Sequence, residues 1–218
     1  MGSSRDIMFS DQFVFTNKSP IVTIQLHPSD YELTLKKLLI YYGDRHSAHP
    51  VFYWNNGYNN LVKLSLEKQK LRYNPIPNDR PYHNPLSLIP VQKLPGLYIF
   101  DNLLDFAFLS PAEKSVRESQ IYNCVNRLSH QSKVQVVLLG EWIQLSPKLR
   151  LKLDQIQLSL PTGQDISKTL EAELKQKPTV KLISACQGLS WGDIYHELAN
   201  SESVSDLESL AQELLITA

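Results

Sequence analysis

The stretch Gly96-Leu97-Tyr98-Ile99-Phe100-Asp101-Asn102-Leu103-Leu104-Asp105 decides the fold class of this chain. Its apolar residues 97–100 run directly into Asp101. A short continuous apolar run of this kind is typical of a strand that is buried on both faces of a sheet. An acidic residue at the end of such a strand would lie at the carboxyl edge of the sheet, where open α/β folds bind ligands. In a nucleotide hydrolase, a strand of this type holds magnesium.

Other segments have the composition of strands, and β-branched and aromatic residues dominate them. We predict strands over residues 21–26, 51–54, 61–64, 134–140 and 156–160. The run 134–140 is almost entirely apolar, so we expect it to be central in the sheet. The Asn56-Gly57 pair favours a tight turn and predicts that the strands on either side of it form a hairpin.

Two helices are predicted between these strands, over about 30–42 and 112–129. Ser29 or Asp30 is a good N-cap for the first helix, and Gly43 is expected to end it. Strands that are separated by single helices imply crossover connections and a mostly parallel sheet. The sequence therefore predicts a three-layer α/β domain.

The remaining segments complete the predicted organisation. The proline-rich residues 67–84 are expected to form a surface loop, followed by a short helix at about 85–93. After Pro161 the pattern becomes helical, with helices expected over 164–176, 178–187, 189–199 and 204–216. We therefore expect an N-terminal extension over 1–18, with a short helix, an α/β domain over 19–162 and a helical subdomain over 163–218.

The bulk composition excludes several classes of protein. The 218 residues include 22 Lys plus Arg and 22 Asp plus Glu, so the formal net charge is zero and gives no general reason to bind nucleic acid or an anionic membrane. The sequence contains no apolar run long enough to cross a bilayer and no secretory signal at its start. Cys124 and Cys186 are expected to be buried free thiols, with a long-range disulfide as the alternative. We expect a cytoplasmic protein.

The order of several weak motifs resembles an AAA+ domain, a form of the P-loop NTPase fold. The strand that ends in Asp101 resembles the Walker B strand, and residues 136–140 resemble the strand that follows it. The segment 145–161, from Leu-Ser-Pro-Lys-Leu to Leu-Pro, is similar to a family segment with a proline, a basic residue and a strand ending in Leu-Pro. The segment 187–194, Gln-Gly-Leu-Ser-Trp-Gly-Asp-Ile, resembles the start of a helix in the family's lid.

The layout is similar to the degenerate N-terminal module of the Ycf-type AAA+ proteins of cyanobacteria and chloroplasts. In those proteins, a module without a Walker A motif precedes a complete ATPase module. The resemblance covers about residues 19–200. It implies a cyanobacterial or plastid-like pseudo-ATPase that acts through protein–protein interaction.

The departures from an active AAA+ domain concern phosphate binding. A phosphate loop needs glycine at a tight turn and a lysine that neutralises the phosphates. After the first predicted strand, residues 27–34 read His-Pro-Ser-Asp-Tyr-Glu-Leu-Thr, and no glycine occurs between Gly2 and Gly43. Asp30 and Glu32 would place negative charge where phosphates bind. The chain is therefore expected not to be an enzyme.

Three residues are candidates for a remnant of the nucleotide cleft. Asp101 could hold a metal, or it could cap the turn after its strand. Asn102 stands where hydrolysing members of the family carry the glutamate that activates water. Arg150 lies where an arginine finger could reach a neighbouring subunit, with solvated surface charge as the alternative. No set of metal ligands and no cofactor is expected, and no catalytic residue is assigned.

The leading hypothesis is a non-catalytic AAA+-like module that binds a protein, either an ATPase partner or further copies of itself. One alternative is a nucleotide-binding or weakly active AAA+ ATPase, which the Asp101 strand would favour. Another is an AAA-like protein associated with nucleic acid, which the zero net charge opposes. The aromatic residues Tyr53 and Trp54 could stack on bases, although packing in the core is the simpler interpretation.

Overall fold

The computed structural model describes residues 19–46, 48–55, 61–76, 86, 94–104, 109–128, 133–201, 207–209 and 211–212. The described residues divide into two compact units. We name residues 19–26 and 38–157 the sheet unit, and residues 27–37 together with those from 158 onward the helical unit. The segment that follows the first strand therefore belongs with the C-terminal helices.

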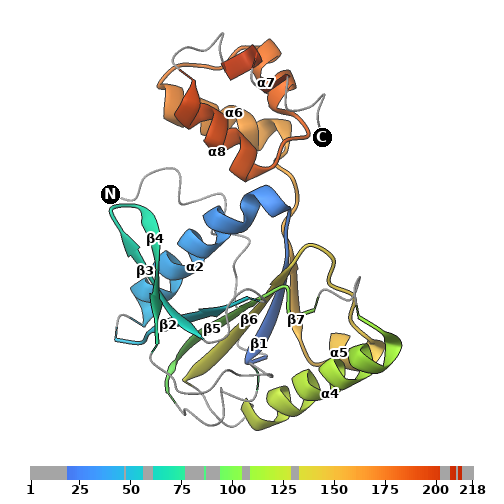
Figure 1. Cartoon of the computed structure of the whole chain (residues 1–218). Helices are drawn as coiled ribbons and strands as arrows, with labels where there is room; N and C mark the ends of the chain where they lie inside the picture. The colour runs from blue at the N-terminus through green and yellow to red at the C-terminus, as the bar shows by residue number, and fades with distance from the viewer. Residues whose placement is uncertain are drawn as a thin grey trace. The chain divides into compact units, whose positions relative to one another are not determined.

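Within the described residues, the sheet unit contains one seven-stranded sheet in the order β4-β3-β2-β5-β6-β1-β7 (Figure 1). The strands are β1 (Ile21–Gln25), β2 (Val51–Trp54), β3 (Val62–Glu67), β4 (Lys70–Pro75), β5 (Gly96–Asp101), β6 (Val134–Gly140) and β7 (Asp154–Gln157). The pairs β2–β5, β5–β6, β6–β1 and β1–β7 are parallel, and β3 pairs antiparallel with both β2 and β4. The predictions of a mostly parallel sheet and of a central strand at 134–140 are confirmed.

Helices cover both faces of this sheet, because its central strands are apolar on both sides. All residues of β5 are buried. Tyr98 and Phe100 of β5 belong to the same core cluster as Ile121 and Cys124 of α4 (Pro111–Leu128). Within the sheet unit, Figure 1 shows α4 and the part of α2 (Tyr31–Arg45) from Leu38 onward on opposite sides of the strands. The predicted three-layer arrangement is confirmed.

The helical unit is built from η1 (Pro28–Asp30), the start of α2, α6 (Gly163–Leu174), α7 (Val180–Cys186) and α8 (Trp191–Asn200). Each of α6 and α8 begins with a capping box, in which Thr162 pairs with Asp165 and Ser190 pairs with Asp193. The core of this unit contains the following buried residues: Ile166, Leu170, Leu182, Ala185, Cys186, Leu189, Ile194, Leu207 and Ala211. The helices predicted over 164–176, 178–187 and 189–199 are confirmed within a few residues.

The end predicted for the first helix is wrong. Helix α2 continues through Gly43 to Arg45. A glycine ends a helix where its backbone adopts the left-handed conformation. Among the described glycines, Gly188 is the one with a positive φ, of 95°. Within a helix, Gly43 costs about 1 kcal/mol relative to alanine, which packing of the helix readily offsets.

The loop predicted over 67–84 is partly wrong, because residues 70–75 form the strand β4. Lys68 and Gln69 adopt left-handed φ values of 47° and 66°, and this turn lets β4 pair back onto β3. The last strand, β7, lies a few residues earlier than the predicted 156–160. A short helix that was not predicted, α5 (Pro147–Arg150), precedes it. The short helices predicted within 1–18 and 85–93 lie outside the described residues, except for Leu86.

The two cysteines are free and buried, as predicted. Burial raises the pKa of Cys124 to about 12 and that of Cys186 to about 11, so both thiols are neutral at physiological pH.

Among the described helices, none is both long enough and apolar enough to span a lipid bilayer.

Candidate functional site

The segment after β1, residues 27–34, contains no glycine or lysine and forms the single turn η1 before α2 begins. His27 caps this turn, because its side chain accepts a hydrogen bond from the Ser29 amide at 3.4 Å. The predicted N-caps, Ser29 and Asp30, lie inside η1, directly before α2 begins at Tyr31. The Asp30 carboxylate serves a different helix: it accepts a hydrogen bond of 2.6 Å from the amide of Gly192 in α8, which is 162 residues away in the sequence.

Gly192 brings the backbones of α8 and η1 into direct contact within the helical unit. A Cβ atom at position 192 would lie 1.7 Å from the carbonyl oxygen of Ser29 and 2.5 Å from its carbonyl carbon. No side chain fits there. The buried Asp30, with 2% of its surface exposed, lies at the N-terminus of α8, where unpaired amides and the helix dipole favour an anion. The chain's own carboxylate thus fills an anion-binding helix end.

The environment of Asp30 opposes its ionisation. Burial raises the pKa of Asp30, and the nearby Asp193 adds to this, while the hydrogen bond from Gly192 and the neighbouring His27 lower it without cancelling the rise. At Asp193, burial also raises the pKa, but hydrogen bonds from Ser190 and Ser29 outweigh it and hold the pKa below its usual range. The pKa values of the two carboxylates at this helix end are therefore shifted in opposite directions.

This difference predicts opposite pH dependence for two matched variants. Asp30→Asn keeps an oxygen that can accept from Gly192 and removes the charge. Because the folded chain holds the Asp30 proton more tightly than the unfolded chain does, the stability of the wild type relative to Asp30→Asn should fall as the pH rises from about 4 through the raised pKa. For Asp193→Asn the relative stability of the wild type should instead rise with pH. For Asp193→Asn this rise should occur below about pH 4, because the folded pKa lies under the ordinary value. Urea unfolding between pH 2.5 and 8 measures both, and a stability difference for Asp30→Asn that is constant or rises with pH would contradict the prediction.

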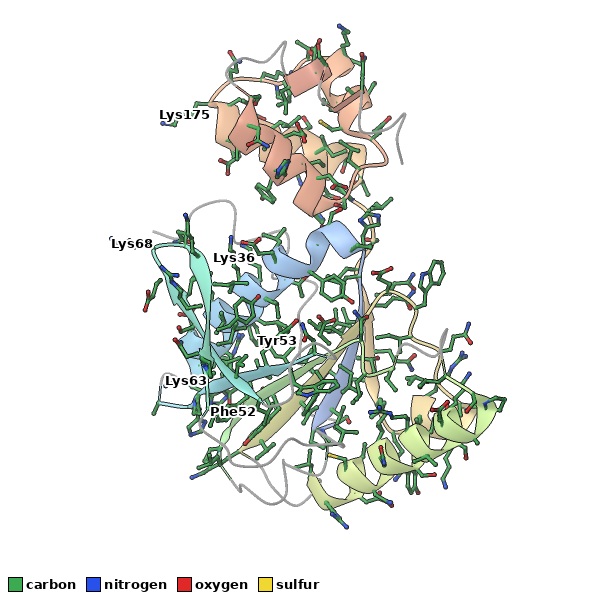
Figure 2. The ribbon with its side chains drawn as sticks, in the orientation of Figure 1. Lys36, Phe52, Tyr53, Lys63, Lys68 and Lys175 are labelled. Atoms are coloured by element: carbon green, nitrogen blue, oxygen red, sulfur yellow. The ribbon has the colours of Figure 1, made fainter. Side chains whose placement is uncertain are left out.

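Asp101, at the end of β5, is bonded within the sheet unit. The hydroxyl of Tyr53 on β2 donates a hydrogen bond of 2.7 Å to the Asp101 carboxylate, and the Asn55 side-chain amide donates to the Tyr53 oxygen at 3.2 Å. Tyr53, labelled in Figure 2, and Asp101 are both buried. Burial, together with the Asp101 charge, raises the pKa of Tyr53 far above its usual range, so the phenol remains a donor.

Asn102 follows Asp101 in a left-handed conformation, with a φ of 54°. Its amide donates to the Leu139 carbonyl at 2.9 Å, which ties the turn to β6. The Asn102 side-chain oxygen lies 3.9 Å from the place where a Cβ at Gly140 would stand. Asparagine tolerates this backbone conformation better than most side chains do. Asp101 and Asn102 thus lie together where β5 and β6 end.

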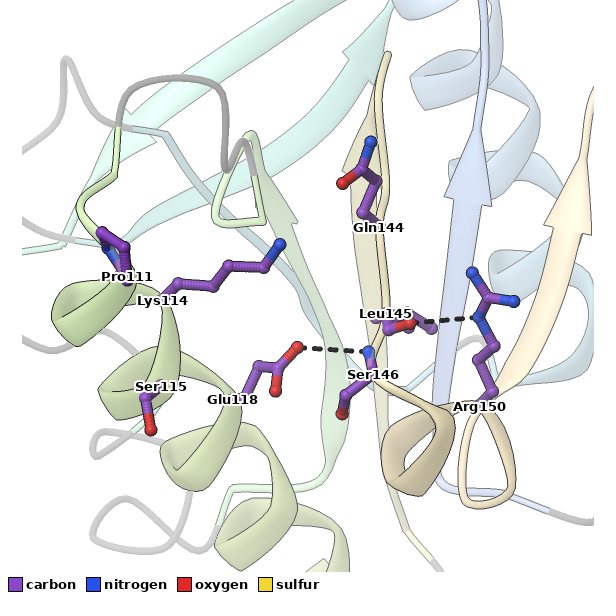
Figure 3. A pocket seen from close by; sticks show the side chains of 8 residues that line it. All are labelled: Pro111, Lys114, Ser115, Glu118, Gln144, Leu145, Ser146 and Arg150. Atoms are coloured by element: carbon purple, nitrogen blue, oxygen red, sulfur yellow. Dashed lines mark hydrogen bonds between the residues drawn. The ribbon is translucent and has the colours of Figure 1, made fainter.

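Arg150 lies elsewhere in the sheet unit, in a groove of about 490 Å³ between α4 and the segment that leads into α5 (Figure 3). The groove is lined by Pro111, Lys114, Ser115, Glu118, Gln144, Leu145, Ser146 and Arg150. The Nε atom of Arg150 donates to the Leu145 carbonyl at 3.0 Å. Neither Asp101 nor Asn102 lines this groove, so the three predicted candidates do not lie together in it.

Comparisons with known proteins identify the fold. No protein-family model and no curated protein matches the sequence. A chain in the structure of the HORMA–CdnC–Trip13 complex of E. coli MS115-1 matches with a TM-score of 0.54 at 13% identity, over 90% of this chain and 74% of that one. The proteins that this chain resembles in structure are AAA+ proteins. This chain has the AAA+ fold.

Two further AAA+ structures have lower scores. C. elegans PCH-2 matches with a TM-score of 0.46 at 11% identity, over 95% of this chain and 63% of PCH-2. Domain III of the replication initiation protein DnaA from Thermotoga maritima matches with a TM-score of 0.48 at 10% identity, over 98% of this chain and 93% of the domain. This chain thus spans less than two thirds of PCH-2.

Within the AAA+ fold of this chain, sequence reasoning missed the partners of two predicted residues. It singled out Asp101 without Tyr53, and it noted the charge of Asp30 without Gly192. The only sequence signal for Tyr53 was its place at the end of an apolar strand. Nothing local signals Gly192, because its partner is remote in the sequence. Among the described residues, no group of three or more His, Cys, Asp or Glu side chains could hold a metal ion.

Proposed function

We propose that this chain is a non-catalytic AAA+ module that acts by binding a protein, either an ATPase partner or further copies of its own chain. The observation that carries the proposal is the hydrogen bond from Gly192 to the buried Asp30 carboxylate, directly after β1. In nucleotide-binding members of this fold, the loop after the first strand cradles phosphates with backbone amides and a lysine. Here the same stretch presents a carboxylate of its own.

Electrostatics support this proposal. A phosphate near the Asp30 or Glu32 carboxylate would be repelled, by of order 1 kcal/mol or more for each pair of charges. Residues 27–34 contain no lysine or arginine, and the nearby Lys36 is already paired with Glu32 at 2.7 Å. A triphosphate would therefore meet the Asp30 charge without a cation of this segment to offset it.

The state of Asp101 and Asn102 gives independent support. One oxygen of the Asp101 carboxylate, the group that would bind magnesium, accepts a hydrogen bond from the Tyr53 hydroxyl. Asn102, in the position of the catalytic glutamate, offers an amide that cannot act as a general base. Both features disfavour ATP hydrolysis.

Two observations favour a protein as the binding partner. The formal net charge of zero gives no general electrostatic attraction to nucleic acid. The HORMA–CdnC–Trip13 structure is a complex of several proteins, so a chain with this fold takes part in a protein assembly there. We extend this mode of action to the present chain.

Calorimetric titration of the purified chain with ATP and magnesium tests the proposal. We expect no saturable heat up to roughly 1 mM nucleotide, which corresponds to a binding free energy weaker than about −4 kcal/mol. An ATPase with an intact phosphate loop is the positive control. Saturable binding that is lost in Asp101→Ala, or magnesium-dependent turnover of ATP, would overturn the proposal.

A further inference from the structure

We infer that the groove between α4 and the β6–α5 segment is a docking surface for an acidic, partly apolar segment of a protein partner. This inference rests on the proposed function, because it names the surface and the partner chemistry of a protein-binding module. All residues of the groove belong to the sheet unit.

The walls of the groove come from two elements that are fixed to each other. On α4, the lining residues Pro111, Lys114, Ser115 and Glu118 recur at the spacing of one helix face. The Glu118 carboxylate accepts a hydrogen bond of 3.1 Å from the Ser146 amide, which joins this face to the segment that begins α5. A preformed groove lowers the conformational cost of binding an extended segment.

The charges in the groove favour an anionic ligand. Figure 3 shows the Lys114 side chain extending from α4 and the Arg150 guanidinium standing on the opposite wall. Glu118 is the one acidic residue in the lining, and one of its oxygens accepts a hydrogen bond from the Ser146 amide, so the two cations leave the lining with a net positive charge. Within the described ranges, Arg150 forms no ion pair, and its terminal nitrogens can therefore receive a carboxylate in a bidentate fashion.

Two exposed apolar residues are close in the sequence to residues of the lining. Trp142, two residues before the lining residue Gln144, is 71% exposed, and Leu151, directly after Arg150, is 88% exposed. The other two tryptophans of the chain, Trp54 and Trp191, are buried. Tryptophan and arginine are enriched among the residues that dominate protein interfaces, so their placement here favours a protein ligand with apolar residues beside its carboxylates.

A nucleic acid fits this surface less well. Non-specific binding to nucleic acid requires a run of phosphate contacts from clustered cations. The groove offers Lys114 and Arg150 together with the carboxylate of Glu118. A leucine side chain such as Leu151 also has no favourable role against phosphates. An acidic protein segment can use the two cations, and its apolar residues can use the leucine.

Trp142 supplies a direct probe, because it is the exposed one of the three tryptophans. The ligand used is a short peptide of Asp-Leu-Glu repeats, and its control is the same peptide with Asn and Gln in place of the acids. Binding of the acidic peptide should shield Trp142 and reduce quenching of the tryptophan emission by acrylamide at least twofold. The amide peptide should have no effect. Absence of shielding by the acidic peptide at roughly 1 mM would overturn the inference.

Variants locate the binding site, with anisotropy of a fluorescein label on the peptide as the second readout. Arg150→Gln and Trp142→Ala should each weaken binding about tenfold, which corresponds to about 1.4 kcal/mol. Lys63→Gln on β3, an exposed cation away from the groove lining, is the matched control and should not change binding. Equal weakening by all three variants, or shielding of Trp142 by single-stranded DNA but not by the peptide, would also overturn the inference.

The result is separable from the test of the proposed function. If ATP does not bind and the peptide fails, only the docking surface is wrong. If ATP binds and is hydrolysed while the peptide still shields Trp142, the docking surface is supported and the non-catalytic role is refuted.

Discussion

Gly192→Ala is expected to destabilise the helical unit by about 3 kcal/mol. The added methyl group would lie 1.7 Å from the Ser29 carbonyl oxygen, and a backbone atom cannot rotate aside as the end of a side chain can. Overpacking costs about 1–3 kcal/mol where the surroundings can adjust, so this site belongs at the upper end. Moving α8 away would also lengthen the hydrogen bond from the Gly192 amide to Asp30. Urea unfolding, with hydrogen exchange of the α8 amides, measures the effect.

Gly43→Ala is the matched control, because Gly43 also lies inside a helix and a Cβ there would meet nothing within 4 Å. The same chemical change should therefore stabilise the chain, by up to about 1 kcal/mol. If Gly192→Ala lowers the free energy of unfolding and Gly43→Ala raises it, the effect at position 192 comes from the contact with Ser29. A Gly192→Ala variant with wild-type stability and wild-type exchange in α8 would show that η1 and α8 do not touch as described.

Tyr53→Phe is expected to destabilise the sheet unit by about 2–3 kcal/mol. The substitution keeps the ring, which packs edge-on against Tyr73, and removes the donor that bonds to Asp101 at 2.7 Å. Hydrogen bonds to a charged group contribute about 1.5–3 kcal/mol, and a buried carboxylate that loses a donor is poorly solvated. Chemical denaturation at neutral pH measures the change.

Tyr98→Phe is the comparison for this variant. Tyr98 is a buried tyrosine of the same sheet, and its hydroxyl donates to the neutral carbonyl of Leu94 at 3.1 Å. Loss of a bond to a neutral, partly accessible acceptor should cost about 1 kcal/mol. If both variants cost the same, the Asp101 carboxylate does not depend on the Tyr53 hydroxyl, and the support that this bond gives to the non-catalytic proposal is lost.

Local physical chemistry predicted most of the fold. The apolar runs that became β1, β5 and β6 are too short for helices and too apolar for an exposed strand, and single helices between them leave a parallel sheet as the simplest arrangement. Tyr53 and Trp54 lie in the core, as their packing interpretation predicted, and are not available to stack on bases. The edge strand β4 escaped prediction, because Lys70 and Pro75 bound a polar segment whose pairing depends on the turn at Lys68 and Gln69.

The candidate site was less predictable, because its hydrogen bonds join residues that are remote in the sequence. The charge of Asp30 was visible in the sequence, but its bond to Gly192 was not. Asp101 could be identified by the strand that it ends, whereas its bond to Tyr53 depends on the register in which Tyr53 lies beside Ile99. Single residues at strand ends can therefore be identified from sequence, whereas their partners require the assembled sheet.

The two outermost strands of the sheet bear on how the chain behaves at high concentration. An unpaired strand edge invites other chains to add strands, which leads to aggregation. On one edge, β4 is mostly exposed, carries Lys70 and Arg72 and ends at Pro75. On the other edge, β7 is only four residues long and begins with Asp154. Charge, proline and shortness protect both edges, which matters for a chain whose net charge of zero gives it little mutual repulsion at neutral pH.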